Sequence, residues 1–138
     1  MKRNASLALI EQVIMLLILI IAAALCMKAF VWSDQKSLYY GDRDRAMVEL
    51  QSAAEVLKAN GGDFSAAAAA YGGSATQTRW VLEFDENWNP TSSVGTYRIY
   101  ATAVACDVDY LGCATLTAQP AAGDILAQLT VSWQEVAP

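Results

Sequence analysis

The stretch SLALIEQVIMLLILIIAAALCM, residues Ser6–Met27, decides the organisation of this 138-residue chain. Its central part, Val13–Met27, is unbroken in apolar residues, and apolar neighbours on both sides bring the run to the roughly 20 residues that cross a bilayer as a helix. Glu11 lies inside this stretch, although an ionised carboxylate near the middle of a membrane-spanning helix costs about 2.5–3.5 kcal/mol. A charge at that cost is expected to have a partner.

The residues that flank the apolar stretch predict its orientation. Lys2 and Arg3 precede it and favour a cytoplasmic N-terminus. At the far end, Lys28 can extend its amine to the interface, and Trp32 is an aromatic residue of the kind enriched there. We therefore expect a single-pass anchor in the cytoplasmic membrane, with everything from Ser33 onward outside the cytoplasm.

A cleaved secretory signal peptide is the alternative for this segment. It would use Ala22-Ala23-Ala24 as its small-residue cleavage site, but the polar pair Glu11 and Gln12 fits its apolar region poorly. A lipoprotein signal is set aside because Leu25, rather than a small residue, precedes Cys26.

Composition excludes several classes of function. Glu11 is the one acid before Ser33, and Lys2, Arg3 and Lys28 are the bases there, which leaves 13 acids and 6 bases from the chain's totals of 14 and 9. An acidic remainder of this kind does not favour nucleic-acid binding. The chain has no histidine and none of its three cysteines makes a CxxC pair, so we expect no enzyme activity, no cofactor and no metal site.

The short basic leader Met1–Ser6, followed by Leu7-Ala8-Leu9-Ile10-Glu11 and an apolar helix, resembles the N-terminus of type IV pilins and type II secretion pseudopilins. The resemblance covers about the first 35 residues. It implies that a prepilin peptidase cuts between Ser6 and Leu7, that the new N-terminus is methylated, and that Glu11 becomes the fifth residue. Ser6 and Leu7 stand where the family favours Gly and then Phe or Met.

The resemblance also implies a function. The chain would be a structural subunit, a minor pilin or pseudopilin, that assembles into a pilus-like or secretion-system filament at the cell surface or in the periplasm. In such filaments the glutamate of one subunit meets the N-terminal amine of a neighbour, which would give Glu11 its partner. The implied partners are other pilin or pseudopilin subunits, prepilin peptidase, inner-membrane platform proteins and the lipid bilayer. The alternative is a monomeric, single-pass, membrane-anchored extracytoplasmic binding domain.

The helix is expected to continue beyond the membrane. We divide the chain into a leader, residues 1–6, a transmembrane and filament-core helix, 7–32, an amphipathic continuation, 33–60, and a head, 61–138. In the continuation an apolar stripe recurs at spacings of three and four residues: Met47, Leu50, Ala54 and Leu57. Gly41 predicts a bend or a local melting point, and Asn60-Gly61-Gly62 predicts the end of the helix.

The head has the sequence pattern of a short helix followed by strands. Residues 63–71 predict a capped helix, and Trp80, Leu82 and Phe84 alternate with polar neighbours as in a half-buried strand. Further strands are expected over 95–106, 113–119 and 124–136. The predicted fold class is α+β, with the long N-terminal helix packed on a small antiparallel sheet of three or four strands.

Three clusters in the head carry specific expectations. Cys106 and Cys113 end one predicted strand and begin the next, and we expect a disulfide between them in the extracytoplasmic compartment. Between them, Asp107-Val108-Asp109 resembles part of a calcium loop but lacks its later acidic ligand. The segment Asp42–Arg45 is expected to be a solvated charged entry to the helix, with an ion pair between subunits as the alternative. Five aromatic residues are expected in the core or at its rim: Trp80, Tyr97, Tyr100, Tyr110 and Trp133.

Overall fold

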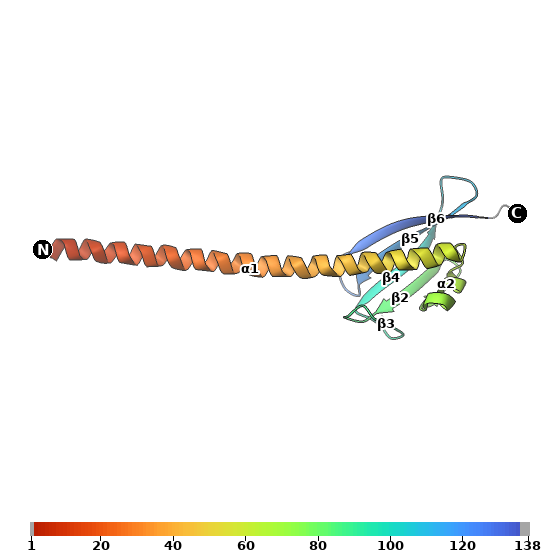
Figure 1. Ribbon diagram of the computed structural model, residues 1–138, viewed down its shortest axis with the longest axis horizontal. Helices are drawn as coiled ribbons and strands as arrows, with labels where there is room; N and C mark the ends of the chain where they lie inside the picture. The colour runs from red at the N-terminus through yellow and green to blue at the C-terminus, as the bar shows by residue number, and fades with distance from the viewer. Residues whose placement is uncertain (1, 136–138) are drawn as a thin grey trace. The chain divides into compact units, whose positions relative to one another are not determined.

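The computed structural model describes residues 2–135, with side chains from Ser6 onward, and confirms the α+β class. The chain divides into two units, one up to Tyr40 and one from Gly41 onward. Helix α1, Lys2–Ala59, belongs to both (Figure 1). From here on the head means this second unit, which includes α1 from Gly41 as well as the expected head from residue 61. Its other elements are α2 (Phe64–Tyr71), β1 (Ser74–Ala75), β2 (Arg79–Phe84), β3 (Pro90–Thr91), β4 (Tyr97–Val104), β5 (Leu111–Pro120) and β6 (Ala127–Gln134).

The first unit is a single helix with no core of its own. Every residue from Ser6 to Tyr40 is exposed, and the least exposed large apolar side chain between Leu7 and Trp32 is Ile14 at 51%. The segment is long and apolar enough to cross a membrane. Nothing among residues 6–40 therefore covers the apolar side chains of this helix.

The local melting expected as one alternative at Gly41 is wrong, because α1 is helical on both sides of Gly41 and through it. One glycine in a helix costs about 1 kcal/mol, which the hydrogen bonds of the neighbouring turns can offset. Gly41 nonetheless begins the head, since the boundary between the two units falls directly before it. The helix ends at Ala59, at the expected Asn60-Gly61-Gly62 sequence.

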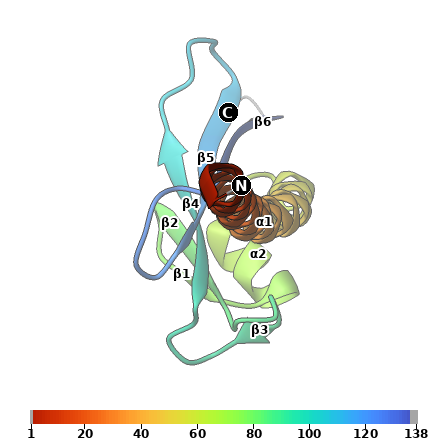
Figure 2. The same cartoon turned by 90° about the vertical axis from the view of Figure 1, so that its left-hand side faces the viewer.

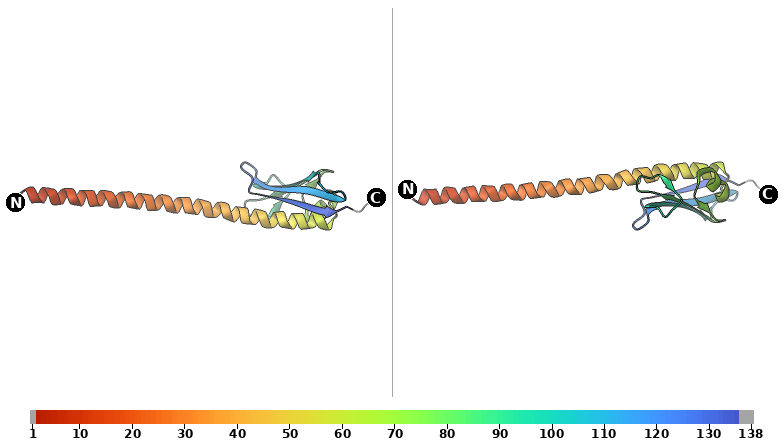
Figure 3. Two further views of the ribbon diagram at one scale, coloured as in Figure 1. Left: turned by 90° about the horizontal axis from the view of Figure 1, so that it is seen from above. Right: turned by 90° about the horizontal axis from the view of Figure 1, so that it is seen from below.

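In the head, the last five turns of α1 lie on one face of an antiparallel sheet (Figures 1 and 3). The strand order is β1-β2-β4-β5-β6, and β3 pairs with β2. Leu50 and Leu57 are completely buried, as the apolar stripe predicted, and Met47 is partly buried. The core also takes in Ala46 and Ala53, which the stripe did not include.

The register of the sheet explains how the helix fits against it. One row across the strands pairs Trp80 with Ala101, Ala101 with Leu116 and Leu116 with Leu129. Ala114 and Ala118 on β5 are also buried, so the middle of the sheet is lined largely by small side chains. Small residues on both surfaces let the backbone of α1 approach the sheet closely, while the larger side chains fill the space on either side.

The expected strands correspond to β2, β4, β5 and β6, with ends shifted by a few residues. Val136, the last residue of the expected fourth strand, lies outside the described residues. The sheet has two further strands, β1 and β3, which are too short to show an alternating pattern. Of the expected core aromatics, Tyr110 is wrong, because it is 65% exposed, whereas Trp88 is buried although it lies in the loop between β2 and β3.

Two local features organise the start of α2 and the end of α1. The carboxylate of Asp63 accepts hydrogen bonds from the backbone of Ser65 and Ala66, which caps α2 as expected. The indole of Trp133 lies against both Gly62, just after α1, and Gly112 on β5, where any larger residue would overlap its ring. This packing fixes the C-terminal end of α1 to the β5–β6 edge of the sheet.

Candidate assembly site

The predicted cleavage site lies within helix α1. Ser6 and Leu7 are both helical and exposed, four and five residues after the helix begins at Lys2. The first turn contains no acidic residue to favour the positive end of the helix dipole, and it carries the basic pair Lys2 and Arg3 instead. The first four N–H groups of a helix also lack intrahelical partners, so hydrogen bonding is incomplete in the turn that precedes Ser6 and Leu7.

Glu11 follows one turn later and is exposed like the residues around it. The one ion pair within residues 6–135 joins Arg98 and Glu83, so no described side chain of the chain itself neutralises Glu11. The nearest described base along α1 is Lys28, which is about 25 Å away at a rise of 1.5 Å per residue. The described side chains therefore include no ion-pair partner for Glu11.

The expected disulfide is present. Cys106 and Cys113 are bridged with their Cα atoms 5.6 Å apart. Cys113 lies within β5 opposite Val104, and Cys106 follows β4, so the bridge closes the protruding connection between these strands (Figure 2). This closed loop exposes Val108 by 59% and Tyr110 by 65%.

The two aspartates of that loop do not come together with other ligands. Within the described part of the chain, no group of three or more His, Cys, Asp or Glu side chains is placed to hold a metal ion. Asp107 and Asp109 are both exposed.

The β2–β3 loop is a second organised feature of the head, and its hydrogen bonds are those of a turn. Asp85 accepts hydrogen bonds from the backbone N–H groups of Asn87 and Asn89 and from the Asn89 side chain. Those from Asn89 hold the pKa of Asp85 below its usual range. Trp88 folds back over the core, stacked on Tyr97 with ring centroids 4.2 Å apart.

This loop contacts the start of the head's helix. Arg45 donates a hydrogen bond to the backbone oxygen of Asn87 at 3.2 Å. Burial raises the pKa of Tyr97, and the carboxylate of Asp42 adds to the shift. Two of the four charged residues in Asp42–Arg45 therefore have neighbours within the head, while Arg43, Asp44 and Arg45 are exposed, as expected of a solvated segment.

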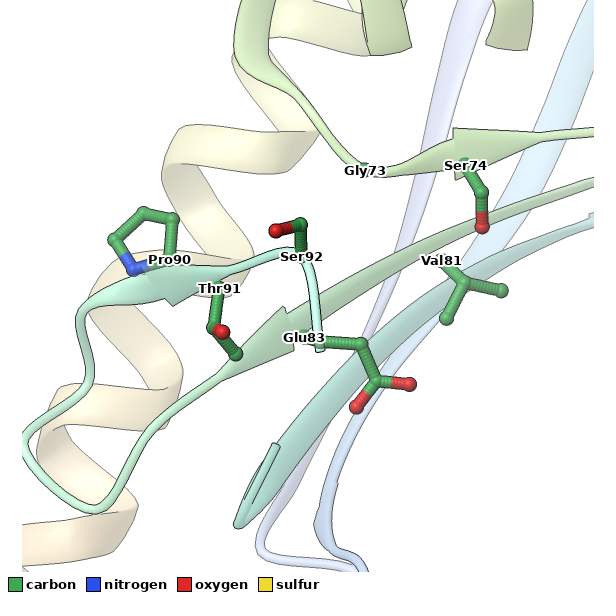
Figure 4. A pocket seen from close by; sticks show the side chains of 7 residues that line it. All are labelled: Gly73, Ser74, Val81, Glu83, Pro90, Thr91 and Ser92. Carbon is green, nitrogen blue, oxygen red and sulfur yellow. The ribbon is translucent and has the colours of Figure 1, made fainter. Parts of the chain in front are cut away.

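A shallow groove of about 350 Å³ lies between β1 and β3, with Val81 and Glu83 of β2 at its floor (Figure 4). Its chemistry is limited. The two oxygens of Glu83 accept hydrogen bonds from Arg98 Nε at 2.7 Å and from the backbone of Gly95 at 3.1 Å. Since this carboxylate is already engaged, the hydroxyl groups of Ser74, Thr91 and Ser92 have no free general base in the groove.

The two edges of the sheet differ in whether further strands cover them. Along β2, β1 pairs with Trp80 and Val81, and β3 pairs with Glu83 and Phe84, so two short strands cover one edge. On the other side, β6 pairs with β5 alone among the described residues, and it contains no charged residue and no proline. Edges of this kind are available to a further strand.

No family model, no curated protein and no solved structure matches this chain.

Proposed function

We propose that this chain is the structural subunit of a pilus-like or secretion-system filament, a minor pilin or pseudopilin that is inserted in a membrane, processed between Ser6 and Leu7, and then assembled. The observation that carries the proposal is the apolar helix from Leu7 to Trp32. It is exposed along its whole length and holds one carboxylate, Glu11, without a described partner in its own chain. A surface of this kind is suited first to lipid and then to other copies of the same helix.

Cleavage between Ser6 and Leu7 would bring Glu11 close to a new helix N-terminus. In the uncut chain Glu11 is the tenth residue of α1, counted from Lys2, and afterwards it would be the fifth residue from a free amine at Leu7. An acid close to a helix N-terminus interacts favourably with the helix dipole. Processing therefore removes two basic residues, creates a positive charge and brings the carboxylate close to the end of the helix.

In an assembled bundle, the carboxylate of one subunit would meet the amine of the next. Both charges lose water there, so their attraction adds little net stability, but leaving either one unpaired is costly. The pair would thus select the longitudinal offset between neighbouring helices. Head contacts, including the open β6 edge, would add to an interface that the helices align.

One observation favours the alternative function, a monomeric anchored binding domain. The disulfide-closed loop between β4 and β5 holds Val108 and Tyr110 exposed on a short, constrained segment. Preorganised loops with exposed aromatic residues are common in binding surfaces. Chemical cross-linking in membranes separates the two functions, because the binding domain would remain a monomer where the filament subunit forms ladders of oligomers.

Glu11→Ala is the most direct test of assembly. When the chain is expressed with a prepilin peptidase and its partner subunits, the variant should reach the membrane at least as well as the parent, because a charge has been removed. Its amount in sheared filaments should fall about tenfold or more, because a neighbour's amine is left buried and unpaired.

Gln12→Ala is the matched control, since it removes the adjacent polar side chain without removing a charge. It should leave both membrane insertion and filament incorporation within about twofold of the parent. Normal incorporation of Glu11→Ala would show that the carboxylate has no part in assembly.

A further inference from the structure

The membrane-distal part of the exposed helix carries a basic and aromatic face. Lys28, Trp32, Lys36 and Tyr39 follow at spacings of four, four and three residues, which places them on one side of α1. Trp32 is 66% exposed and Tyr39 is 43% exposed. The acid of this segment, Asp34, is two residues from Trp32 and so faces another direction.

The side chains on this face are close enough to act together. The amine of Lys36 lies 5.8 Å from the centroid of the Trp32 ring. Trp32, Lys36 and Tyr39, with Gln35, line a surface groove of about 260 Å³. The groove thus combines an ammonium group, an indole N–H, a phenol and an amide, which are all groups that can donate hydrogen bonds to a phosphate.

The length of the helix sets the depth of this face in a bilayer. Glu11 and Lys28 are 17 residues apart, which corresponds to about 25 Å of helix, whereas the hydrocarbon core is about 30 Å thick. An untilted helix therefore cannot keep both charged groups outside the core by position alone. Lysine can reach the interface with its four-carbon stem, while glutamate has a much shorter reach.

The lowest-cost depth consequently puts Glu11 at the inner boundary of the hydrocarbon core. The helix between Glu11 and Trp32 is then about 31 Å long, which places Trp32 at the outer boundary. Lys36 and Tyr39 follow within the next 10 Å or so, at the level of the lipid headgroups.

We propose that the face of Lys28, Trp32, Lys36 and Tyr39 binds anionic phospholipid headgroups of the outer leaflet, and that this contact holds Glu11 at the headgroup level of the inner leaflet until assembly. The inference rests on the proposed function only in taking α1 to span a membrane. In the inserted monomer, the Glu11 carboxylate is then hydrated, and it becomes a buried charge only when the helix leaves lipid for the filament.

The depth of Trp32 can be measured with the full chain in phosphatidylglycerol vesicles that contain brominated lipids. Quenching of tryptophan fluorescence should be stronger with bromine near the headgroup than with bromine near the chain ends. Trp32→Phe should abolish this quenching, because the other tryptophans, Trp80, Trp88 and Trp133, lie in the head. Stronger quenching by the deep bromines, or quenching that survives Trp32→Phe, would overturn the proposal.

The depth of the glutamate is read from spin labels at two positions. One label is attached to Cys26, the free cysteine of the described residues, and the other to Gln12→Cys in a Cys26→Ser background. With a water-soluble nickel chelate on both sides of the vesicle, the label at position 12 should be accessible and that at Cys26 protected. Protection at both positions would place Glu11 in the hydrocarbon core and contradict the assigned depth.

Headgroup selectivity is tested with spin-labelled lipids. The parent should associate with phosphatidylglycerol about two- to fivefold more than with phosphatidylcholine, as expected for one or two lysines near the surface. Lys36→Gln should reduce this preference, whereas Lys58→Gln, an exposed lysine in the head, should retain it. Equal association of the two lipids with the parent would overturn the headgroup contact.

These experiments need neither the peptidase nor partner subunits. A chain that shows the assigned depth but is never processed would refute the filament proposal alone. A chain that assembles into filaments but shows no lipid preference would refute only the headgroup contact.

Discussion

Trp88 lies in a demanding position for so large a side chain. Its φ angle is +62°, in the left-handed region that residues with a side chain avoid, and its indole N–H is buried without a hydrogen-bond partner. Both features are unfavourable. They are offset by burial to 6% exposure and by stacking on Tyr97, with the ring planes 14° apart.

These opposing contributions predict different outcomes for two substitutions. Trp88→Ala should lower the free energy of unfolding by about 3–5 kcal/mol, because the stacked ring is lost and a cavity remains. Trp88→Phe should change it by only about 1 kcal/mol, because it keeps an aromatic ring and removes the unpaired donor. Urea unfolding of the full chain in detergent micelles, followed by near-UV circular dichroism, measures both. Equal losses for the two variants would contradict the stabilising role of an aromatic ring stacked on Tyr97.

Asp85 gives the head a pH dependence whose sign follows from its hydrogen bonds. Its pKa in the folded chain is lowered by the backbone and side chain of Asn89, below the value of about 3.9 for an unfolded aspartate. The stability that it contributes is therefore present above about pH 4 and is lost as pH falls through the folded pKa. The parent should exceed Asp85→Asn in stability near neutral pH, and the difference should shrink on acidification. A difference that stays constant down to about pH 2.5 would contradict this role.

At the scale of elements, two glycines in different settings predict opposite effects of the same substitution. Gly112→Ala would bring a methyl group into the Trp133 ring and should lower the free energy of unfolding by about 1–3 kcal/mol. Gly41→Ala meets no neighbouring atom within 4 Å in the middle of α1 and should stabilise the helix by about 1 kcal/mol. Amide hydrogen exchange around each position measures both. Destabilisation by Gly41→Ala would indicate that the helix needs its glycine.

The strands were predictable because one face of each is buried. Trp80, Leu82 and Phe84 alternate with more exposed neighbours along β2, and this period-two pattern survives in the structure. Alanine carries a weaker signal, since it is common on every surface, and so Ala46 and Ala53 of the core did not stand out from the exposed alanines. Trp88 was missed for another reason: a tertiary stack, rather than a local pattern, draws this turn residue inward.

The candidate sites differ in how much of each could be predicted from the sequence. Cys106 and Cys113 flank a short connection between strands, so the hairpin itself brings them together, and the predicted bridge is present. The order of Ser6, Leu7 and Glu11 along the helix follows from the sequence as well. In the proposed function, what completes their role lies outside the chain, because peptidase, lipid and neighbouring helix would all act on the exposed surface of residues 6–40.

At the scale of the whole molecule, the two parts of helix α1 have surfaces suited to different surroundings. From Ser6 to Tyr40 the apolar side chains of α1 are exposed on every side, as suits lipid or other helices. From Gly41 to Ala59 the same helix buries only one stripe, as suits the face of a sheet in water. The chain can thus change its surroundings in the first unit while the core of the head remains intact.

The central claim is that α1 is a processed assembly helix, and the mature N-terminus tests it most directly. The chain is expressed with a matching prepilin peptidase, recovered from membranes, and its N-terminal peptide is read by mass spectrometry, with an inactive peptidase as the control. We predict a chain that begins at Leu7 only when the peptidase is active. A chain that begins at Met1 under both conditions, or just after Ala24, would contradict the account.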